Sequence, residues 1–197
     1  MIKIIFAVIL SCFMFVSCAG SGRDEKPIHV SDYSASAAKY MPLEIGNKWV
    51  YSVNYMGSSG EIEVIINAFD GEWFVDNRGG KLKIDRRGIR DDERYILMFP
   101  LQREEWISII DTRTTEIRKT VGVDEPVTVP AGRFEGAIKV HTFVSIPGNR
   151  ILHSYHFFVS GVGIVKIETF LEDVREGTIT RQTTTELVKY DLKETKS

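Results

Sequence analysis

The fold class of this chain follows from the stretch Trp49-Val50-Tyr51-Ser52-Val53-Asn54-Tyr55. Its side chains alternate, so that Trp49, Tyr51, Val53 and Tyr55 fall on one face and the residues between them on the other. Alternation with a period of two is typical of a β-strand, because successive side chains point to opposite faces. We therefore expect the fold to begin with a strand that has one aromatic face.

The sequence that follows predicts a hairpin. Ile62, Val64, Ile66 and Ala68 share one face of a second alternating run, and Gly57-Ser58-Ser59-Gly60 offers a permissive turn between the two runs. Further turn signals stand at Asp70-Gly71, Gly79-Gly80, Arg87-Gly88, Pro147-Gly148-Asn149 and Glu176-Gly177. Turns at this spacing, with alternating segments between them, indicate an antiparallel meander.

Later segments agree with this interpretation. Apolar and β-branched residues alternate over 138–146 and 165–171, and no long amphipathic helix follows Tyr40. The threonine-rich run 178–185 predicts a solvated or edge strand. We expect an all-β or nearly all-β domain of about nine to twelve strands, in which an antiparallel meander forms a strongly curved sheet, half-barrel or barrel.

The N-terminus has the pattern of an export signal. An apolar run, 4–16, follows the single charge of Lys3 and is shorter than the roughly 20 residues of a membrane-spanning helix. The ending Phe15-Val16-Ser17-Cys18 resembles a bacterial lipobox, which implies cleavage after Ser17 and acylation of Cys18. Cys12 is a weaker candidate, because cleavage there would leave the apolar residues 13–16 on the mature protein.

The chain therefore divides into four predicted segments. They are a lipoprotein signal peptide (1–17), the lipidated cysteine with a flexible tether (18–39), a single β-rich domain (40–193) and a C-terminal tail (194–197). The tether is predicted from its small, polar and charged residues. A short helix over 31–39 is the alternative for its last part, although only alanines and tyrosines would form its apolar face.

Composition excludes several classes of function. Residues 1–17 contain only Lys3 among charged side chains, so their removal leaves 180 residues with 24 basic and 27 acidic groups, a formal net charge of −3. This balance argues against nucleic-acid binding, which requires clustered positive charge. Both cysteines lie in the signal region, so the mature chain has no internal disulfide, cysteine nucleophile or thiolate metal site.

Four blocks of sequence occur in order between about residues 40 and 166. They are Pro42-Leu43-x-x-Gly46-Asn47-x-Trp49-x-Tyr51, Pro100-Leu101 with Trp106, Val129-Pro130-Ala131-Gly132-x-Phe134, and Gly161-Val162-Gly163-x-Val165-Lys166. Together they resemble a broad group of exported bacterial lipoproteins, a β-rich family without an assigned activity. The resemblance implies a fold and a location but no catalytic residue. The chain departs from the pattern at 102–105 and at Val159-Ser160.

A more distant resemblance is to the lipoprotein-carrier fold, a curved sheet whose concave side holds acyl chains, and this likeness is one of fold only. Residue chemistry favours structural roles for the four blocks. Proline and glycine predict a turn at Val129–Gly132, and Gly161-Val162-Gly163 predicts a bulge or a close approach of strands. Trp49, Trp73 and Trp106 are interpreted as core aromatics rather than as a sugar platform.

The sequence contains no recognisable catalytic or metal-binding pattern. It has no Gly-x-Ser-x-Gly elbow and no His-Glu-x-x-His motif. His153 and His156 would face opposite sides of a strand. With a turn near Gly148, His153 lies opposite a position close to Phe143, so that a contact with His141 is at best diagonal. We expect ordinary strand histidines, no catalytic residue, no metal site and no cofactor.

Clusters of charge are interpreted as exposed turns. The run 85–94 holds four arginines among acidic residues, lacks the ligand spacing of a calcium loop, and predicts a self-neutralising exposed hairpin. Acidic pairs such as Glu172-Asp173 are interpreted as solvated turn residues.

Two functions fit these features. The first is a non-enzymatic lipoprotein of the bacterial cell envelope, held in the membrane by acyl chains on Cys18 and acting as a structural or protein-interaction module. Ala19 replaces the aspartate that, by resemblance to enteric lipoproteins, retains such proteins at the inner membrane, which favours the outer membrane facing the periplasm. The alternative is a carrier or sensor that binds a lipid or acyl chain in the concavity of the sheet, because 95–99 and 155–159 are apolar on both faces. No ligand-binding residue is identified at this point.

Overall fold

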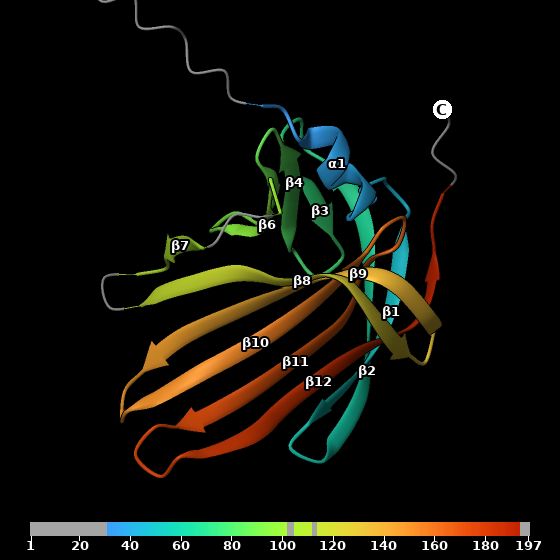
Figure 1. The fold of residues 1–197 in the computed structure, drawn as a ribbon. Helices are drawn as coiled ribbons and strands as arrows, with labels where there is room; N and C mark the ends of the chain where they lie inside the picture. The colour runs from blue at the N-terminus through green and yellow to red at the C-terminus, as the bar shows by residue number, and fades with distance from the viewer. Residues whose placement is uncertain (1–30, 102–104, 112–113, 194–197) are drawn as a thin grey trace, which may run out of the picture. The chain divides into compact units, whose positions relative to one another are not determined.

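The described residues, 31–101, 105–111 and 114–193, form one short helix and twelve strands in a computed structural model (Figure 1). In chain order the elements are α1 (Ser34–Lys39), β1 (Lys48–Tyr55), β2 (Ser58–Phe69), β3 (Phe74–Asp76), β4 (Lys81–Asp85), β5 (Gly88–Arg90), β6 (Tyr95–Met98), β7 (Trp106–Ile109), β8 (Thr115–Val129), β9 (Gly132–Ile146), β10 (Arg150–Val159), β11 (Gly163–Asp173) and β12 (Thr178–Asp191). The all-β prediction is confirmed, with the number of strands at the upper end of the expected range.

The strands form one antiparallel sheet in the order β6-β5-β4-β3-β2-β1-β12-β11-β10-β9-β8-β7. Chain neighbours pair in two meanders, β1 to β6 and β7 to β12, and the pairing of β1 with β12 joins them. The sheet curls until it is nearly closed and barrel-shaped. The predicted meander and strongly curved sheet are therefore confirmed.

The first hairpin turns slightly earlier than the sequence predicted. Tyr55 pairs with Ser58, so the turn consists of Met56 and Gly57 alone, and residues 58–60 extend β2. Met56 has a φ of 47° and Gly57 a φ of 89°. A two-residue turn with both residues in the left-handed region matches the natural twist of a hairpin, which explains the shift.

The threonine-rich run 178–185 belongs to β12, which pairs with β1 on one side and β11 on the other. The prediction of an edge strand is therefore wrong, although most of the run is exposed or half-buried as expected. Composition predicts solvation, whereas the position of a strand depends on which distant segments pair. The edges are instead the short strands β6 and β7.

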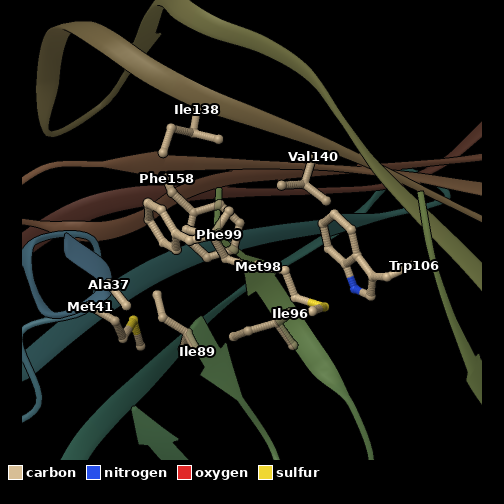
Figure 2. Close-up of a cluster of buried hydrophobic side chains, with 11 residues drawn as sticks. Ala37, Met41, Ile89, Ile96, Met98, Phe99, Trp106, Ile138, Val140 and Phe158 are labelled. Atoms are coloured by element: carbon tan, nitrogen blue, oxygen red, sulfur yellow. The ribbon is translucent and has the colours of Figure 1, made fainter. Parts of the chain in front are cut away.

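A first core fills the concave side of the sheet (Figure 2). Its buried members are Ala37, Met41, Ile89, Ile96, Leu97, Met98, Phe99, Trp106, Ile138, Val140 and Phe158. Figure 2 shows Ile138, Val140 and Phe158 directed toward side chains of the opposite wall such as Met98 and Phe99. Burial of this apolar surface is the main force that holds the two meanders together.

A second core lies under the end of the β8–β9 hairpin. Its buried members are Trp49, Tyr51, Ile66, Val127, Val129, Ala137, Phe157, Val159, Val162, Val165 and Leu187. The hairpin tip is held by the amide of Ala131, which donates to the carbonyl of Leu187 at 2.9 Å. Phe158 packs in the first core while Phe157 and Val159 pack in the second, so β10 is apolar on both faces because it lies between two cores.

A buried ion pair closes the sheet between β8 and β6, and we call its contacts the seam. Arg118 Nε lies 2.5 Å from Glu116 Oε1, and these residues are only 3% and 5% exposed. Arg94 Nη1 lies 3.1 Å from the other carboxylate oxygen of Glu116. Arg118 Nη1 donates to the carbonyl of Ile96 at 3.4 Å. Side chains thus join β8 to β6, two strands that do not pair with each other.

The seam corrects one prediction from the sequence. The run 85–94 was interpreted as an exposed, self-neutralising hairpin, and Arg94 does contact Asp91 and Glu93. However, Arg94 also reaches the buried Glu116, and Ile89 is fully buried in the first core. Ile89 was not recognised as a core residue because charged residues surround it in the sequence.

The sequence blocks that resemble exported lipoproteins contain residues with structural roles, and the predicted turn at Val129–Gly132 is present between β8 and β9. The side chain of Asn47 donates to the carbonyl of Pro42 at 2.7 Å and accepts from the amide of Lys193 at 2.8 Å. Trp49 Nε1 donates to the carbonyl of Val162 at 2.7 Å. Gly163 has a φ of 106°, a left-handed conformation that favours glycine, and a Cβ atom there would lie in ordinary contact with the side chains of Met41 and Trp49. The blocks therefore tie distant parts of the chain together.

The folded part begins earlier than the boundary at Tyr40 that the sequence predicted. Helix α1 lies within the range assigned to the flexible tether and matches the alternative of a short helix over 31–39, and Ala37 is fully buried in the first core. The ring of Tyr33 stacks on Phe99 with centroids 6.1 Å apart. The small side chain of alanine lets the helix approach the sheet, which explains how so weak an apolar face can pack. The compact unit that contains the sheet starts at Ser31.

Candidate functional site

Strands β7 to β12 present an outer face on the side opposite the first core. Residues paired across antiparallel strands share a face, and neighbours along a strand alternate between faces. One row of successive cross-strand partners crosses all six strands and consists of Ile107, Ile117, Phe143, His153, Phe170 and Arg181. Its first member follows Trp106, which is buried in the first core, so the row lies on the outer face.

Seven apolar side chains form a stripe on this face, which we call the outer stripe. Its members are Ile107, Ile109, Ile117, Phe143, Ile151, Phe170 and Ile179. Ile107, Ile109 and Ile179 are 64%, 77% and 66% exposed. The others are half-buried. Single exposed apolar residues are ordinary, but a continuous group of them is a common mark of a binding surface.

A second row with basic and aromatic side chains runs beside the outer stripe. Lys119, His141, Tyr155 and Glu168 are successive cross-strand partners. The Tyr155 ring stacks on the His141 ring with centroids 4.5 Å apart, and Lys139 Nζ lies 4.9 Å from the centroid of Tyr155. Within the described part of the chain, neither Lys119 nor Lys139 has a carboxylate within ion-pair distance.

A chain of hydrogen bonds links three strands where the two rows meet, and we call it the histidine chain. His141 Nε2 lies 2.9 Å from His153 Nδ1, and His153 Nε2 lies 2.7 Å from Glu172 Oε2. In one consistent order, His153 Nε2–H donates to Glu172 Oε2, and His153 Nδ1 accepts from His141 Nε2–H. In this order each ring donates through Nε2.

The electrostatic setting keeps His141 neutral. Partial burial, followed by the nearby His153 and the cations of Lys119 and Lys139, lowers the pKa of His141 to about 4. A neutral His141 that carries its proton on Nε2 donates it to His153 Nδ1. The histidine chain is thus a polar network at the border between the outer stripe and the row of basic and aromatic side chains.

The structure tests the predicted arrangement of the histidines directly. His153 pairs with Phe143, as the position of the turn predicted, and its contact with His141 is diagonal. Glu172 was interpreted as a solvated turn acid, but it bonds to His153 instead. This partner was missed because it comes from β11, and the register of β11 against β10 follows from packing rather than from any local sequence signal.

Two cavities lie at or beside the outer stripe. One cavity of about 460 Å³ is lined by Ser52, Asn54, Lys166, Arg181, Thr184 and Glu186, among others. The acids nearby are paired, since Lys166 lies 3.3 Å from both Glu168 and Glu186, and Arg181 lies 3.4 Å from Glu168. A smaller cavity of about 240 Å³ is lined by His153, Tyr155, Phe170, Glu172 and Ile179, where the histidine chain meets the stripe.

On the other side of β10, His156 and Ser154 form the one arrangement that resembles a nucleophile and its base among the described residues. Ser154 Oγ lies 3.1 Å from His156 Nε2. However, His156 Nδ1 is buried without a partner, so no acid orients the ring. Burial, followed by the charges of Arg118 and Arg94, lowers the pKa of His156 to about 3, which makes it a weak base. This pair lacks the features of a catalytic dyad.

Several predicted sites are not decided by the structure. Cys18 lies outside the described residues, so its acylation stays a prediction. Within the described ranges, no three His, Cys, Asp or Glu side chains are arranged to hold a metal ion. The same ranges contain no helix with the length and hydropathy needed to cross a membrane.

Comparisons with known proteins add descriptions of neighbours. No protein-family model matches the sequence, and no curated protein matches it. One solved structure with some likeness comes from Bacteroides fragilis NCTC 9343 and is described as an exported protein with a YmcC-like fold. It is 12% identical, covers 75% of this chain and 96% of its own, and has a TM-score of 0.44.

A second solved structure comes from Parabacteroides distasonis ATCC 8503 and is described as a lipoprotein. It is 13% identical, covers 75% of this chain and 96% of its own, and has a TM-score of 0.45. Similarity at this level does not identify a family, so the resemblance based on the four sequence blocks stays a prediction.

Proposed function

We propose that this protein is a lipid-anchored lipoprotein of the bacterial cell envelope and acts as a non-enzymatic binding module. In this proposal, acyl chains on Cys18 hold the protein in a membrane, and the β-sheet domain presents its outer stripe to another component of the envelope. The outer membrane facing the periplasm is the proposed location, on the strength of Ala19 after the cysteine.

The observation that carries the proposal is the outer stripe itself. Seven apolar side chains from β7 to β12 lie together, and its three isoleucines with the greatest exposure come from β7 and β12. The concave side of the same sheet already has its own core. Since nothing among the described residues covers the stripe, a separate molecule is the natural contact for it.

The arrangement of reactive groups supports a non-enzymatic role. The histidine chain runs from His141 through His153 to Glu172 and includes no serine or threonine hydroxyl, and His156 has no orienting acid. General acid or base catalysis works best with a pKa near the operating pH, whereas both His141 and His156 have pKa values lowered to about 4 and 3.

A carrier that holds an apolar ligand inside the curved sheet is the weaker alternative. The first core occupies the concave side with large side chains such as Phe99, Trp106 and Phe158 (Figure 2). Segment 155–159 owes its apolar residues on both faces to the two cores. Native mass spectrometry separates the two functions, because a carrier would retain a lipid mass after purification and a binding module would not.

Photo-crosslinking in cells tests the proposal. A photoreactive amino acid at Ile107 or Ile179 should give adducts with an envelope protein or lipid. The control position is Met56, which is 68% exposed and lies outside the outer stripe. If neither stripe position gives more adduct than Met56, the stripe is not a binding surface and the proposal is wrong.

A further inference from the structure

The outer stripe lies on one face with Lys119 and Lys139. This combination of apolar and basic side chains indicates what kind of partner the face could bind. Ile107 and Ile179 stand at opposite sides of this face, on β7 and β12, and are both mostly exposed. Lys119 lies in the row beside them, directly paired with His141, and Lys139 lies two residues before His141 on the same strand. The face therefore combines apolar side chains with cations at their border.

When the acidic residues that already have partners are set aside, this face carries a net positive charge. Glu168 and Glu186 are paired with Lys166 or Arg181, and Glu172 is hydrogen-bonded to His153. Among the described residues, Lys119 and Lys139 have no acidic partner. The whole chain has a formal net charge of −2, so this local excess of cations runs against the overall charge. An anionic partner is complementary to it.

The polar group inside the outer stripe does not oppose contact with an apolar phase. His153 uses Nδ1 with His141 and Nε2 with Glu172, so both of its ring nitrogens are already bonded. A polar group that keeps its hydrogen bonds costs much less to remove from water than one that loses them. Both ring nitrogens of His153 keep their partners when the face is dehydrated, which lowers the cost of removing this ring from water.

In the proposed function, the anchor keeps the sheet domain within a short distance of a bilayer. Twelve residues, 19–30, separate Cys18 from the start of the compact unit at Ser31. A chain of that length spans at most about 40 Å. The ten residues of β10 extend over about 33 Å, so the reach of this segment is similar to the length of the face. Contacts that are weak alone are then sufficient, because the tether makes them intramolecular in effect.

From these observations we infer that the outer face of β7 to β12 docks on an anionic lipid surface. The isoleucines of the outer stripe enter the boundary between headgroups and acyl chains, and Lys119 and Lys139 face the lipid phosphates. This inference rests on the proposed function, since it names the partner of the same stripe. A protein partner is the competing possibility, and the experiment below separates them.

The test is sedimentation of residues 19–197 with vesicles, because this chain retains the whole compact unit but lacks the anchor. Vesicles of phosphatidylcholine with 30 mol% phosphatidylglycerol are compared with vesicles of phosphatidylcholine alone. We expect binding to the anionic vesicles only, with a marked decrease between low and high salt. The double variant Lys119→Glu/Lys139→Glu should lower the partition coefficient at least tenfold.

Matched controls distinguish this face from general charge and general hydrophobicity. Lys81→Glu/Lys189→Glu changes the net charge equally at two exposed lysines on β4 and β12, and should bind like the unmodified chain. Ile107→Ser/Ile179→Ser should weaken binding severalfold. Ile45→Ser/Met56→Ser removes two exposed apolar residues elsewhere and should not. Urea unfolding of each variant verifies that the fold is unchanged.

The outcomes are distinct. Loss of binding in both outer-face variants, with both controls unaffected, supports docking on anionic lipid. Equal binding to neutral vesicles, equal loss in the charge control, or no vesicle binding at all overturns the inference. If vesicles do not bind but Ile107 and Ile179 crosslink to a protein in cells, the binding module stands and its partner is that protein. If crosslinking also fails, the proposed function fails with it.

Discussion

Removal of Arg118 should open the sheet at the seam. Arg118 and Glu116 are 3% and 5% exposed, and the pair is 2.5 Å apart. The variant Arg118→Met keeps an unbranched apolar stem but leaves the buried carboxylate of Glu116 with Arg94 as its remaining partner. Removing one partner of a buried ion pair costs about 3–5 kcal/mol, and because Arg94 remains we expect about 3 kcal/mol.

The double variant Glu116→Leu/Arg118→Met provides the matched comparison. It removes both buried charges, and well-packed apolar replacements of a buried pair are often close to neutral. We expect a loss of only about 1 kcal/mol relative to the natural protein, and therefore a coupling energy of about 2 kcal/mol or more in the double-mutant cycle. The two variants together separate the cost of an unpaired charge from the cost of altered packing.

Urea unfolding followed by tryptophan fluorescence measures these changes. Trp106 reports on the seam, because its Nε1 donates to the carbonyl of Tyr95 at 2.9 Å. With a slope of about 2 kcal/mol per molar urea, a loss of about 3 kcal/mol moves the midpoint by about 1.5 M. A shift below about 0.5 M for Arg118→Met, or an equal shift for the double variant, would refute the assignment of the seam to this ion pair.

Three further predictions address other parts of the chain. Asn47→Ala should cost about 2 kcal/mol in urea unfolding, because the Pro42 carbonyl and the Lys193 amide lose their buried partner; a cost below 0.5 kcal/mol contradicts this role. Since the folded pKa of His141 is about 4 against 6.5 unfolded, the unfolded chain binds more protons between these values and stability falls as pH decreases through that window. Between pH 7 and pH 5 the free energy of unfolding should decrease by about 1 kcal/mol less in His141→Phe than in the natural protein, after allowance for solvent screening. An equal decrease in both proteins, measured by urea unfolding at the two pH values, counts against the low pKa of His141. Cys18→Ser should release the protein from the membrane fraction, and its retention there would contradict the lipobox interpretation.

Alternation along the chain was sufficient to predict the class of the fold. The runs that begin at Trp49 and Ile62 became β1 and β2, and the turn at Pro147-Gly148-Asn149 set the register of β9 against β10. These features are local, because a turn of fixed length determines which residues pair on its two sides. The prediction that His153 lies opposite Phe143 succeeded for this reason.

Contacts between distant segments could not be predicted in the same way. The pairing of β1 with β12 joins residues more than 120 positions apart, and it moved the run 178–185 from the predicted edge to the interior of the sheet. The seam between Arg94 and Glu116 likewise depends on the curvature of the whole sheet. Curvature arises from the sum of strand twists and from core packing, and no single residue reports it.

The outer stripe was missed because its members are scattered. Ile107 and Ile179 lie in alternating segments more than 70 positions apart, and each looks ordinary in its own strand. Only the registers of five strand pairings bring them onto one face with Phe143 and Phe170. A surface formed across strands has no contiguous sequence pattern, whereas a turn or a signal peptide is encoded by a few neighbouring residues.

The roles of Asn47 and Trp49 explain why the recognisable blocks did not indicate a function. Trp49 donates to the carbonyl of Val162, and Asn47 accepts from the amide of Lys193, so both side chains hold distant segments together and face no solvent. The outer stripe has the opposite properties, since its most exposed isoleucines contribute little to the core and the fold alone does not require them. Blocks of this kind therefore indicate the fold. The chemistry of a binding partner has to be inferred from the exposed surface, which here is the outer stripe.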